Sequence, residues 1–181
     1  MKKIFKKNYK KIGLLGGNFD PPHVGHVHIS KIALKKLKLD FIFRIITKQN
    51  PFKKKPHLKT SARIKLSKKI TKKIRKIGIE YFDNLIKSKN TYDLLNYLKK
   101  NNKSKKLFFL IGADNMINLH KWKNWQKIPK LAKIVVFART GYSSRALKSI
   151  AAKRLNKKEW QYINSSKINI SSSLIRKFSI T

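Results

Sequence analysis

Apolar residues occur along this chain in two arrangements, as short uninterrupted runs and as longer stretches with an apolar residue at every third or fourth position. The runs predict buried strands, and they lie at 12–15, 41–47, 79–82, 107–111, 133–138 and 161–163. The periodic stretches predict helices, and they lie at about 23–39, 60–77, 91–100, 122–131 and 143–155, with a last helix after Ser171 or Ser172. Repeated strand–helix units with such short strands indicate the α/β class, with a doubly wound, mostly parallel sheet covered by helices on both faces.

Two of the predicted helices have well-defined apolar faces. In the helix at 23–39 the apolar positions are Ile29, Ile32, Ala33 and Leu37. In the helix at 60–77, which Thr60 or Ser61 can cap, they are Ala62, Leu66, Ile70, Ile74 and Ile77. The segment at 50–58 contains two prolines and three lysines and predicts a loop. Ligands of a doubly wound sheet bind at the carboxyl ends of its strands, so we expect the functional residues at that edge.

The length and composition indicate one globular unit. The chain has 181 residues, and we expect a single domain at 1–181 that begins with a basic extension at 1–10. It has no cysteine, which excludes both a disulfide framework and a thiolate metal site. No stretch approaches the roughly 18 uncharged apolar residues of a membrane helix, and lysines continue where a signal peptide would have its apolar core. We therefore expect a cytoplasmic protein that does not act at a membrane.

The formal net charge of +39 at pH 7 allows two interpretations. A basic RNA-binding protein is one of them, and it predicts aromatic side chains interleaved on a basic face and a steep dependence on salt. Compositional bias is the other, because the positive residues are mostly lysines spread from Lys2 to Lys177, and Lys, Ile and Asn are all encoded by AT-rich codons. The aromatic residues lie in predicted strands or in the motifs below, so we favour compositional bias and expect no specific nucleic-acid partner. The remaining effect of the charge is to attract anionic nucleotides.

The segment at 15–26, Leu-Gly-Gly-Asn-Phe-Asp-Pro-Pro-His-Val-Gly-His, directly follows the first apolar run. Gly16 and Gly17 allow the backbone to approach a bulky anion, because they have no Cβ. A helix that opens after them directs its free N–H groups and positive dipole end toward the carboxyl end of the strand. His23 and His26 are three positions apart and share one face of the first turn. The segment therefore predicts a site for a polyphosphate.

A second motif, Asn-Ile-Ser-Ser-Ser-Leu-Ile-Arg, covers residues 169–176. Its serines can cap a helix, or they can donate hydrogen bonds to phosphate oxygens. Arg176 lies one turn further on and can reach the same anion with its planar fork of donors.

These two motifs resemble the GGxFDPxHxGH and ISSTxIR signatures of the nucleotidyltransferases, which have a Rossmann-like fold. That group includes the nicotinate mononucleotide adenylyltransferases and the phosphopantetheine adenylyltransferases. The present chain has Ser173 where threonine is usual. The resemblance implies catalytic roles for His23, His26 and Arg176. It also implies ATP or phosphate contacts for Gly16, Gly17, Asn18, Phe19, Ser172 and Ser173.

Segments in the middle of the chain narrow the resemblance to the nicotinate mononucleotide enzymes. Gly112, Asp114 and Trp122 resemble an IGxDx…W stretch, in which the glycine and aspartate contact the nucleotide and the tryptophan lies by the pyridine ring. Thr91 and Tyr92 resemble part of a segment that faces the nicotinate, although the next residue is Asp93 rather than threonine. The phosphopantetheine enzymes are usually shorter and lack both segments.

Three further positions carry expectations of their own. Phe52 and Lys53 stand where the family often has P-P-H-K, so Phe52 replaces a histidine and Lys53 is a candidate phosphate contact. The segment at 139–141 resembles an R-P-G turn of the family, and we interpret it as structural. Asp20 is expected to hydrogen-bond its own turn rather than a metal, and His28 to be a packing or surface residue.

The resemblance implies a complete reaction, in which ATP and nicotinate mononucleotide give nicotinate adenine dinucleotide and pyrophosphate. A phosphate monoester is already a nucleophile at neutral pH, so the site needs positioning and charge neutralisation rather than a general base. With only seven acidic residues, no metal site built by the protein is expected, and Mg²⁺ would arrive on the ATP phosphates. The sequence leaves the oligomeric state open.

Overall fold

The predicted apolar runs form one parallel sheet in the computed structural model, which describes residues 8–50, 52, 54–164 and 172–178. The strands are β1 (Lys11–Gly17), β2 (Phe41–Ile46), β3 (Ile77–Tyr81), β4 (Lys106–Gly112), β5 (Lys133–Phe137) and β6 (Trp160–Ile163). The longer helices are α1 (Val24–Lys36), α2 (Thr60–Thr71) and α4 (Thr91–Lys100). The shorter ones are α3 (Asp83–Ile86), α5 (Ala113–Asn118), α6 (Ile128–Leu131), α7 (Ser143–Leu147), α8 (Ile150–Arg154) and α9 (Ser172–Phe178).

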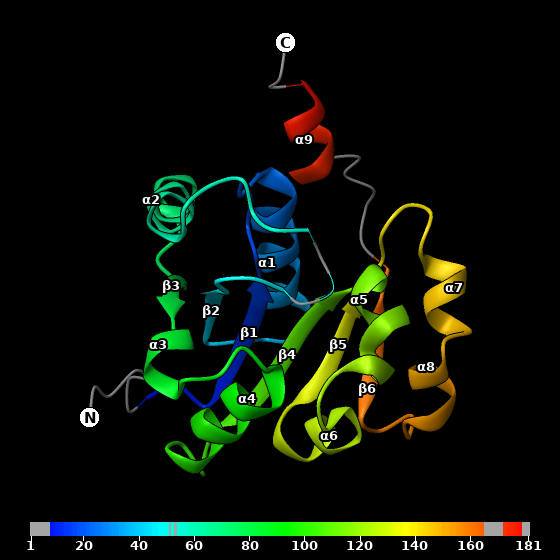
Figure 1. The fold of residues 1–181 in the computed structure, drawn as a ribbon. Helices are drawn as coiled ribbons and strands as arrows, with labels where there is room; N and C mark the ends of the chain where they lie inside the picture. Colours follow the sequence, from blue (N-terminus) through cyan, green and yellow to red (C-terminus); the bar gives the residue numbers. More distant parts are fainter. Residues whose placement is uncertain (1–7, 51, 53, 165–171, 179–181) are drawn as a thin grey trace.

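The six strands lie in the order β3-β2-β1-β4-β5-β6, and every neighbouring pair is parallel. This confirms the predicted doubly wound α/β fold. The chain leaves β1 in one direction to build β2 and β3, and it returns to the other side of β1 for β4 (Figure 1). The switch point therefore lies between the carboxyl ends of β1 and β4, where such sheets bind their ligands.

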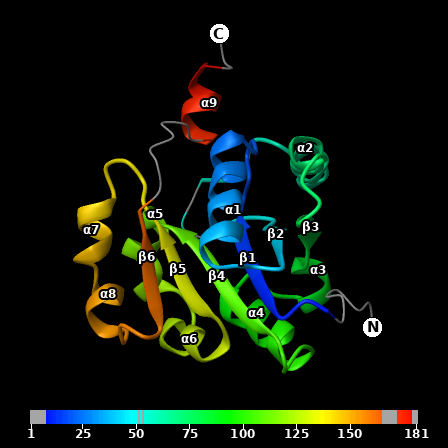
Figure 2. The ribbon, with the colours of Figure 1, turned by 180° about the vertical axis from the view of Figure 1, so that it is seen from behind.

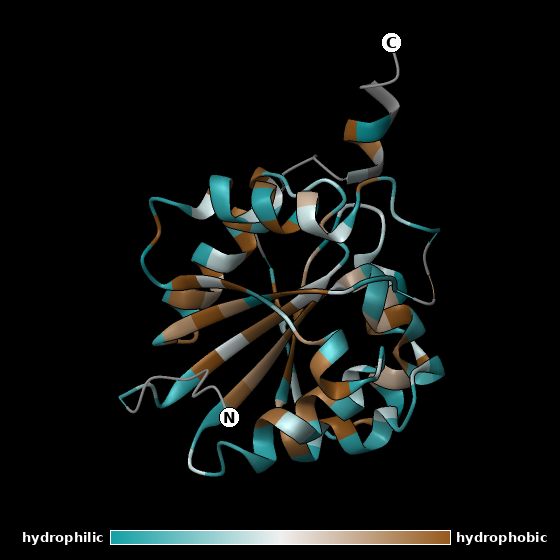
Figure 3. Cartoon of the chain, turned by 60° about the vertical axis from the view of Figure 1, so that its left-hand side comes forward, coloured by the Kyte–Doolittle hydropathy of each residue, from teal (hydrophilic) through white to brown (hydrophobic). Residues whose placement is uncertain are grey.

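Side chains alternate across the strands and build a hydrophobic core on each face of the sheet. In β2, for example, Phe43 and Ile45 join one core, whereas Ile42 and Ile46 join the other. The first core is covered by α4 through α8, and the second by α1 and α2, which Figure 2 shows from behind. Figure 3 shows the strands as a predominantly hydrophobic layer between helices of mixed hydropathy. No helix of the described residues is long and apolar enough to cross a membrane.

The buried face of α2 differs from the prediction. The expected apolar positions Ala62, Leu66 and Ile70 are only half-buried, and Ile77 belongs to β3. The fully buried side chains of α2 are polar instead, and they are Arg63, Ser67 and Thr71. Their spacing of four is as helical as the predicted one, so the apolar pattern identified the helix but placed its buried face one residue away.

Two helices predicted as continuous are broken. The stretch at 122–131 contains a 3₁₀ turn at Trp125–Lys127 followed by α6, because Asn124 has a left-handed backbone (φ 50°) that an α-helix cannot contain. The stretch at 143–155 splits into α7 and α8, because the Ser149 side chain accepts a hydrogen bond from the Ala152 N–H and starts a new helix. The short helices α3 and α5 and the 3₁₀ turn Leu119–Lys121 were not predicted.

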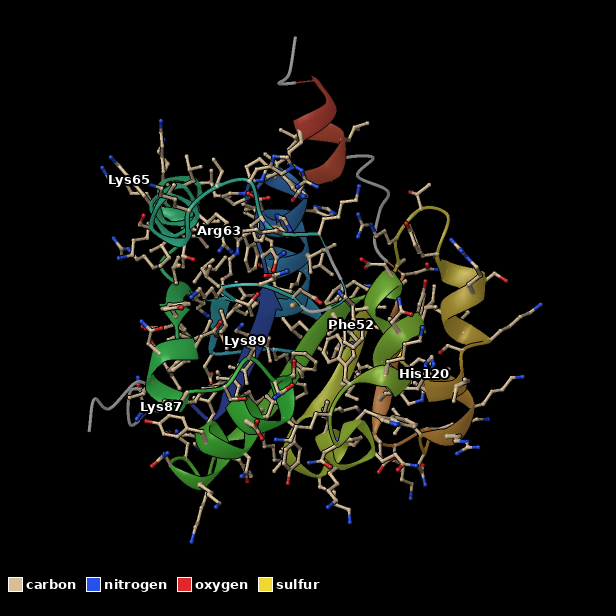
Figure 4. The ribbon with its side chains drawn as sticks, viewed as in Figure 1. Phe52, Arg63, Lys65, Lys87, Lys89 and His120 are labelled. Carbon is tan, nitrogen blue, oxygen red and sulfur yellow. The ribbon has the colours of Figure 1, made fainter. Side chains whose placement is uncertain are left out.

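Arg63 ties the carboxyl ends of β1 and β2 to the loop that precedes α2. Its side chain is 1% exposed, and all five of its N–H groups donate hydrogen bonds. The acceptors are the backbone oxygens of Asn18, Thr47, Lys48 and Leu58 and the hydroxyl of Thr60, at 2.6 to 3.1 Å. Figure 4 shows Arg63 on the side of α2 toward α1, whereas Lys65 of the same helix points away from the protein.

Asp40 makes the corresponding connection at the amino end of the sheet. Its Oδ2 accepts hydrogen bonds from the backbone N–H groups of Lys10 and Lys11, at 2.7 and 2.8 Å. These bonds hold the pKa of the Asp40 carboxyl below its usual value. The described part of the basic extension therefore continues directly into β1.

The hydrogen bonds of Arg63 predict a large loss of stability on substitution. Arg63→Met should lower the free energy of unfolding by about 3 kcal/mol, because four carbonyls lose a charged donor that water cannot fully replace. For a chain of this size that corresponds to a fall in Tm of roughly 6–12 °C. The control is Arg75→Met, which removes the same charge from an exposed position. A fall as small as that of the control, measured by thermal unfolding, would contradict the structural role of Arg63.

Candidate active site

The carboxyl ends of the central strands enclose a cavity of about 1280 Å³ at the switch point. Most of the predicted site residues line it, although they come from five separate parts of the chain. They are Gly16, Gly17, Asn18, Phe19, His23, His26, Thr91, Gly112, Asp114, Trp122, Ser172 and Arg176. Tyr92 does not line the cavity and packs against the core instead. Lys53 and the side chain of Ser173 lie outside the described residues.

The two histidines hold each other at the start of α1. His23 is the N-cap residue, and its Nδ1 accepts a hydrogen bond from the Gly25 N–H at 3.2 Å. The Nδ1 of His26 accepts from the His23 N–H, also at 3.2 Å, so the pair forms a reciprocal capping box. An Nδ1 that accepts a backbone hydrogen bond carries no proton, and the neutral imidazole then carries its proton on Nε2. Both rings are therefore fixed in the tautomer that donates from Nε2.

The surroundings keep His23 uncharged at neutral pH. Burial is the largest cause and the positive charges of Arg139 and Arg44 contribute in the same direction, and together they lower its pKa from 6.5 to about 4. Its ring lies 3.8 Å from that of His26, centroid to centroid. A neutral ring with a fixed N–H can donate to a phosphate oxygen without a change of protonation state.

Phe19 and Asn18 line the cavity and also make contacts that hold its walls. Phe19 is buried and has a left-handed backbone (φ 50°), and its ring lies 4.7 Å from that of His26. The Oδ1 of Asn18 accepts from the Thr47 hydroxyl at 3.1 Å and from the Asn50 N–H at 2.9 Å. Asn18 therefore holds the loop that follows β2, and that loop carries Phe52 to the cavity.

Asp20 joins the first motif to the last helix. Its carboxylate accepts hydrogen bonds from the His57 and Leu58 N–H groups, at 2.8 and 2.9 Å, so it holds the loop before α2 and not only its own turn, as the sequence analysis had expected. Arg176 donates to the Asp20 carbonyl oxygen and lies 3.6 Å from its carboxylate. Ser172 donates to the Pro21 carbonyl oxygen at 2.9 Å. These contacts bring the two motifs together beyond the top of α1, where Figure 1 shows α9.

At the carboxyl end of β4, Asp114 is paired with Arg139. The Nη1 of Arg139 lies 2.7 Å from Oδ2 of Asp114, and its guanidinium stacks over the Tyr142 ring at 5.4 Å. The other carboxylate oxygen leaves no room for a side chain at Gly112, where a Cβ would lie 2.5 Å from it. The segment that contains Arg139 was interpreted as structural, but Arg139 itself lines the cavity.

The far side of the cavity is aromatic. The rings of Phe52 and Trp122 are parallel within 6° with centroids 6.4 Å apart, and Phe52 is 45% exposed. Figure 4 shows Phe52 close to α5. Thr91 begins α4 and lines the same region. This end of the cavity suits a flat ring, whereas the histidine end suits an anion.

Asp93 is engaged at the edge of this aromatic region. It accepts hydrogen bonds from the Ser88 hydroxyl at 2.6 Å and from Lys123 Nζ at 3.2 Å, and these contacts hold its pKa below the usual value. Asn90 also donates to it, at 3.4 Å. The departure from threonine at this position therefore does not leave an uncompensated charge near the cavity.

His28 was expected to be a packing or surface residue, but the structure places it in the lining of the cavity. The sequence analysis also did not single out Arg44 and Arg63, two buried arginines behind the cavity. An arginine within a run of apolar residues, as in Phe-Ile-Phe-Arg-Ile-Ile at 41–46, is the signal that could have identified Arg44.

The low pKa of His23 has a measurable effect on stability. We expect its NMR titration midpoint near pH 4, whereas an unfolded histidine titrates near pH 6.5. Between these values the unfolded chain binds a proton that the folded protein does not, so stability rises with pH through this window and falls on acidification. His23→Asn should remove that part of the pH dependence and should also identify the NMR signal. A midpoint above pH 6 would contradict the burial and charge effects described here.

Comparisons with known proteins agree with this geometry. Residues 14–178 match the family model described as cytidylyltransferase-like. A probable nicotinate-nucleotide adenylyltransferase of Pelagibacter ubique is 47% identical over 167 residues, which are 92% of each chain. One of Aliarcobacter butzleri is 35% identical over 92% of this chain and 86% of its own.

Solved structures share the fold. The Plasmodium falciparum nicotinic acid mononucleotide adenylyltransferase complexed with APC aligns with a TM-score of 0.72 and 21% identity, over 93% of this chain and 83% of that one. The same enzyme complexed with NaAD gives a TM-score of 0.71 and 22% identity. The sequence identity to the bacterial relatives extends over nearly the whole chain, and the family model and the shared fold are consistent with it. The chain therefore belongs to the nicotinate-nucleotide adenylyltransferase family.

Proposed function

We propose that this protein transfers the adenylyl group of ATP to nicotinate mononucleotide, giving nicotinate adenine dinucleotide and pyrophosphate, a step of NAD biosynthesis. The main support for the proposal is the pair of histidines at the switch point. The Nδ1 atom of each accepts a hydrogen bond from a backbone N–H group. Such a pair presents two N–H donors to a polyphosphate from a rigid helix start. The membership of the family supplies the identity of the substrates.

The chemistry needs little beyond this positioning. A phosphate oxygen of the mononucleotide forms a bond to the α-phosphorus of ATP while the bond from that phosphorus to the bridging oxygen of pyrophosphate breaks. His23 and His26 hold the triphosphate and neutralise the charge that develops, and Gly16 and Gly17 let the backbone come close. Arg176 and Ser172 hold the leaving pyrophosphate, with Ser173 and Lys53 as further candidates. The contacts of Arg176 and Ser172 with the loop before α1 support this assignment.

The aromatic end of the cavity would receive the pyridine ring. Trp122 would lie against the ring, and Thr91 would face its carboxylate, while Gly112 and Asp114 would contact the nucleotide. Tyr92 was predicted in the same frame, but its packing against the core argues for a supporting role.

Mg²⁺ is proposed to enter as part of the ATP substrate, where it screens the phosphate charge and keeps most of its waters. Among the residues that the structure describes, no group of three His, Cys, Asp or Glu side chains is placed to hold a metal ion. The carboxylates of Asp20 and Asp114 at the cavity are paired with arginines. This donor set supports a metal that arrives with the nucleotide.

The direct test is a coupled assay of pyrophosphate release from Mg·ATP with each candidate mononucleotide. Release with nicotinate mononucleotide, together with detection of the dinucleotide product, is the expected result. Release only with a pantetheine phosphate, or with no acceptor present, would contradict the proposal.

The histidine pair predicts a large catalytic effect. His26→Ala should lower kcat by roughly two to three orders of magnitude, the usual effect of removing one donor to a transition state. The fold should survive, because the residue lies at the open edge of the sheet. His120→Ala is the control, because His120 does not line the cavity. A folded His26→Ala variant with kcat within threefold of the wild type would exclude His26 from the mechanism.

Selectivity for the acid over the amide mononucleotide is the second prediction. A carboxylate gains from donors and positive potential, and one or two charge-assisted hydrogen bonds give a preference of roughly tenfold to several-hundredfold in kcat/KM. Lys123→Met should reduce that preference by about threefold to tenfold, because Asp93 loses its cation and its charge then repels the substrate carboxylate. Lys127→Met, which changes an exposed lysine outside the cavity, is the matched control. Equal kcat/KM values for acid and amide in the wild type would overturn the assignment of acid selectivity.

A further inference from the structure

Arg44 is a buried cation in the middle of the sheet. It lies in β2 between Leu15 of β1 and Ile79 of β3, and its side chain is 0% exposed. Its neighbours on the same face of the strand, Ile42 and Ile46, belong to the core that α1 and α2 cover. An arginine in this position would ordinarily need several acceptors or a carboxylate.

Arg44 has few of these partners. Its Nε and Nη2 atoms are each 3.4 Å from the Ser30 hydroxyl oxygen, at the long end of hydrogen bonding, and its Nη1 has no hydrogen-bond partner among the described residues. No ion pair to Arg44 occurs in the described part of the chain. Burial accordingly lowers its pKa to about 10, which still leaves it charged at neutral pH. Arg63, by contrast, satisfies all five donors a short distance along the same edge.

The poorly satisfied guanidinium lies directly behind the histidine pair. It sits over the face of the Phe19 ring, 5.9 Å from its centroid. The other neighbours in this stack are His26, 4.7 Å from Phe19, and His23, 3.8 Å from His26. The Phe19 ring therefore lies between the charge of Arg44 and the histidines, and that charge is among the causes of the low pKa of His23.

The charged groups around this stack are almost all positive. Arg63 approaches from α2, Arg139 from the segment after β5 and Arg176 from α9. The carboxylate of Asp20, in the loop before α1, is bound by the His57 and Leu58 N–H groups and by Arg176. The side chain of α1 that accepts hydrogen bonds from Arg44 is the neutral hydroxyl of Ser30. Within the described residues, no acidic side chain is thus placed to balance Arg44.

We infer that Arg44 is a positioning residue for the polyphosphate, a buried charge whose counter-charge is the phosphate chain of the substrate and not a group of the protein. The inference rests on the proposed function, since it requires an anion at the histidine pair. An unpaired charge in the core destabilises the ligand-free protein. An anion bound on the far side of Phe19 interacts favourably with that charge and offsets part of this cost. The same residue then strengthens phosphate binding and weakens the free fold, a common relation between stability and activity.

The test measures pyrophosphate binding by calorimetry, so it does not depend on turnover. Arg44→Met keeps the length and apolar stem of the side chain but removes its charge, and it should weaken the binding of pyrophosphate about tenfold or more. Arg44→Lys keeps the charge and should bind within about threefold of the wild type at pH 7. Arg75→Met, which removes an exposed arginine, is the control for the loss of one unit of net charge and should bind like the wild type.

Two further readouts separate this role from a structural one. The Tm of ligand-free Arg44→Met should equal or exceed that of the wild type, whereas its increase on adding pyrophosphate should be smaller. The NMR titration midpoint of His23 should move upward in Arg44→Met and remain unchanged in Arg75→Met. A side chain that merely fills space would lower the Tm on replacement and leave both the affinity of the folded protein and the His23 midpoint unaltered.

Three results would overturn the inference. The first is binding of pyrophosphate by Arg44→Met with an affinity within twofold of the wild type. The second is a loss of affinity in Arg44→Lys as large as that in Arg44→Met. The third is failure of Arg44→Met to fold, because the ligand-free protein should not need this charge. Failure of the proposed function has a different signature. Wild-type protein that binds pyrophosphate in an Arg44-dependent way but does not convert nicotinate mononucleotide would contradict the proposed reaction and leave the role of Arg44 intact.

Discussion

The site depends on one set of hydrogen bonds, those of the Arg63 guanidinium. At the carboxyl edge of a parallel sheet, the last carbonyl groups have no N–H group of a neighbouring strand to accept a hydrogen bond from. Other donors must therefore bind these carbonyls and the loops that follow. Arg63 supplies five donors, four to backbone oxygens at 18, 47–48 and 58 and one to the Thr60 hydroxyl. The turn before α1, the loop after β2 and the start of α2 therefore move as one unit. The histidine pair, Asn18 and Phe52 keep their relative positions because they belong to that unit.

Two buried arginines lie behind the same cavity and differ in how they are balanced. Arg63 donates all its hydrogen bonds to neutral oxygens of the protein, so its charge is stabilised by five fixed dipoles. Arg44 has one hydroxyl at 3.4 Å and an aromatic face, so its charge is directed toward the cavity. Together with Arg139 and Arg176 they give the carboxyl edge of the sheet a positive potential that does not depend on the many surface lysines. The distinction explains how a site for a polyanion can stay specific in a chain whose whole surface attracts anions.

The sequence predicted the fold class and the strands, and most of the site residues that it predicted line the cavity, because these depend on local patterns. The apolar runs are short and well bounded, and the motif at 15–26 combines glycines, prolines and histidines directly after the first of them. Prediction failed where a long-range contact decides the outcome. The buried face of α2 is polar because Arg63 finds its acceptors on distant loops, and no periodicity contains that information. The stretch at 122–131 breaks at Asn124, and asparagine is a residue type that adopts a left-handed backbone more readily than most, so this break had a local signal that the periodicity did not include. Tyr92 follows Thr91 in sequence but packs against the core.

The scarcity of acidic side chains has a consequence for how this protein is held together. Six of the seven carboxylates, those of Asp20, Asp40, Asp83, Asp93, Asp114 and Glu159, accept hydrogen bonds from particular N–H or O–H groups. In most proteins acidic side chains have two roles: they accept hydrogen bonds from particular groups, and their negative charges balance the positive charges of lysine and arginine. Here Asp20, Asp93 and Asp114 each also pair with one cation, but seven acidic residues cannot balance 46 lysines and arginines, so most of the positive charge must be balanced by dissolved anions. The ionic atmosphere is in this sense a component of the native state, and the compactness of the protein is set jointly by its sequence and by the salt in which it folds.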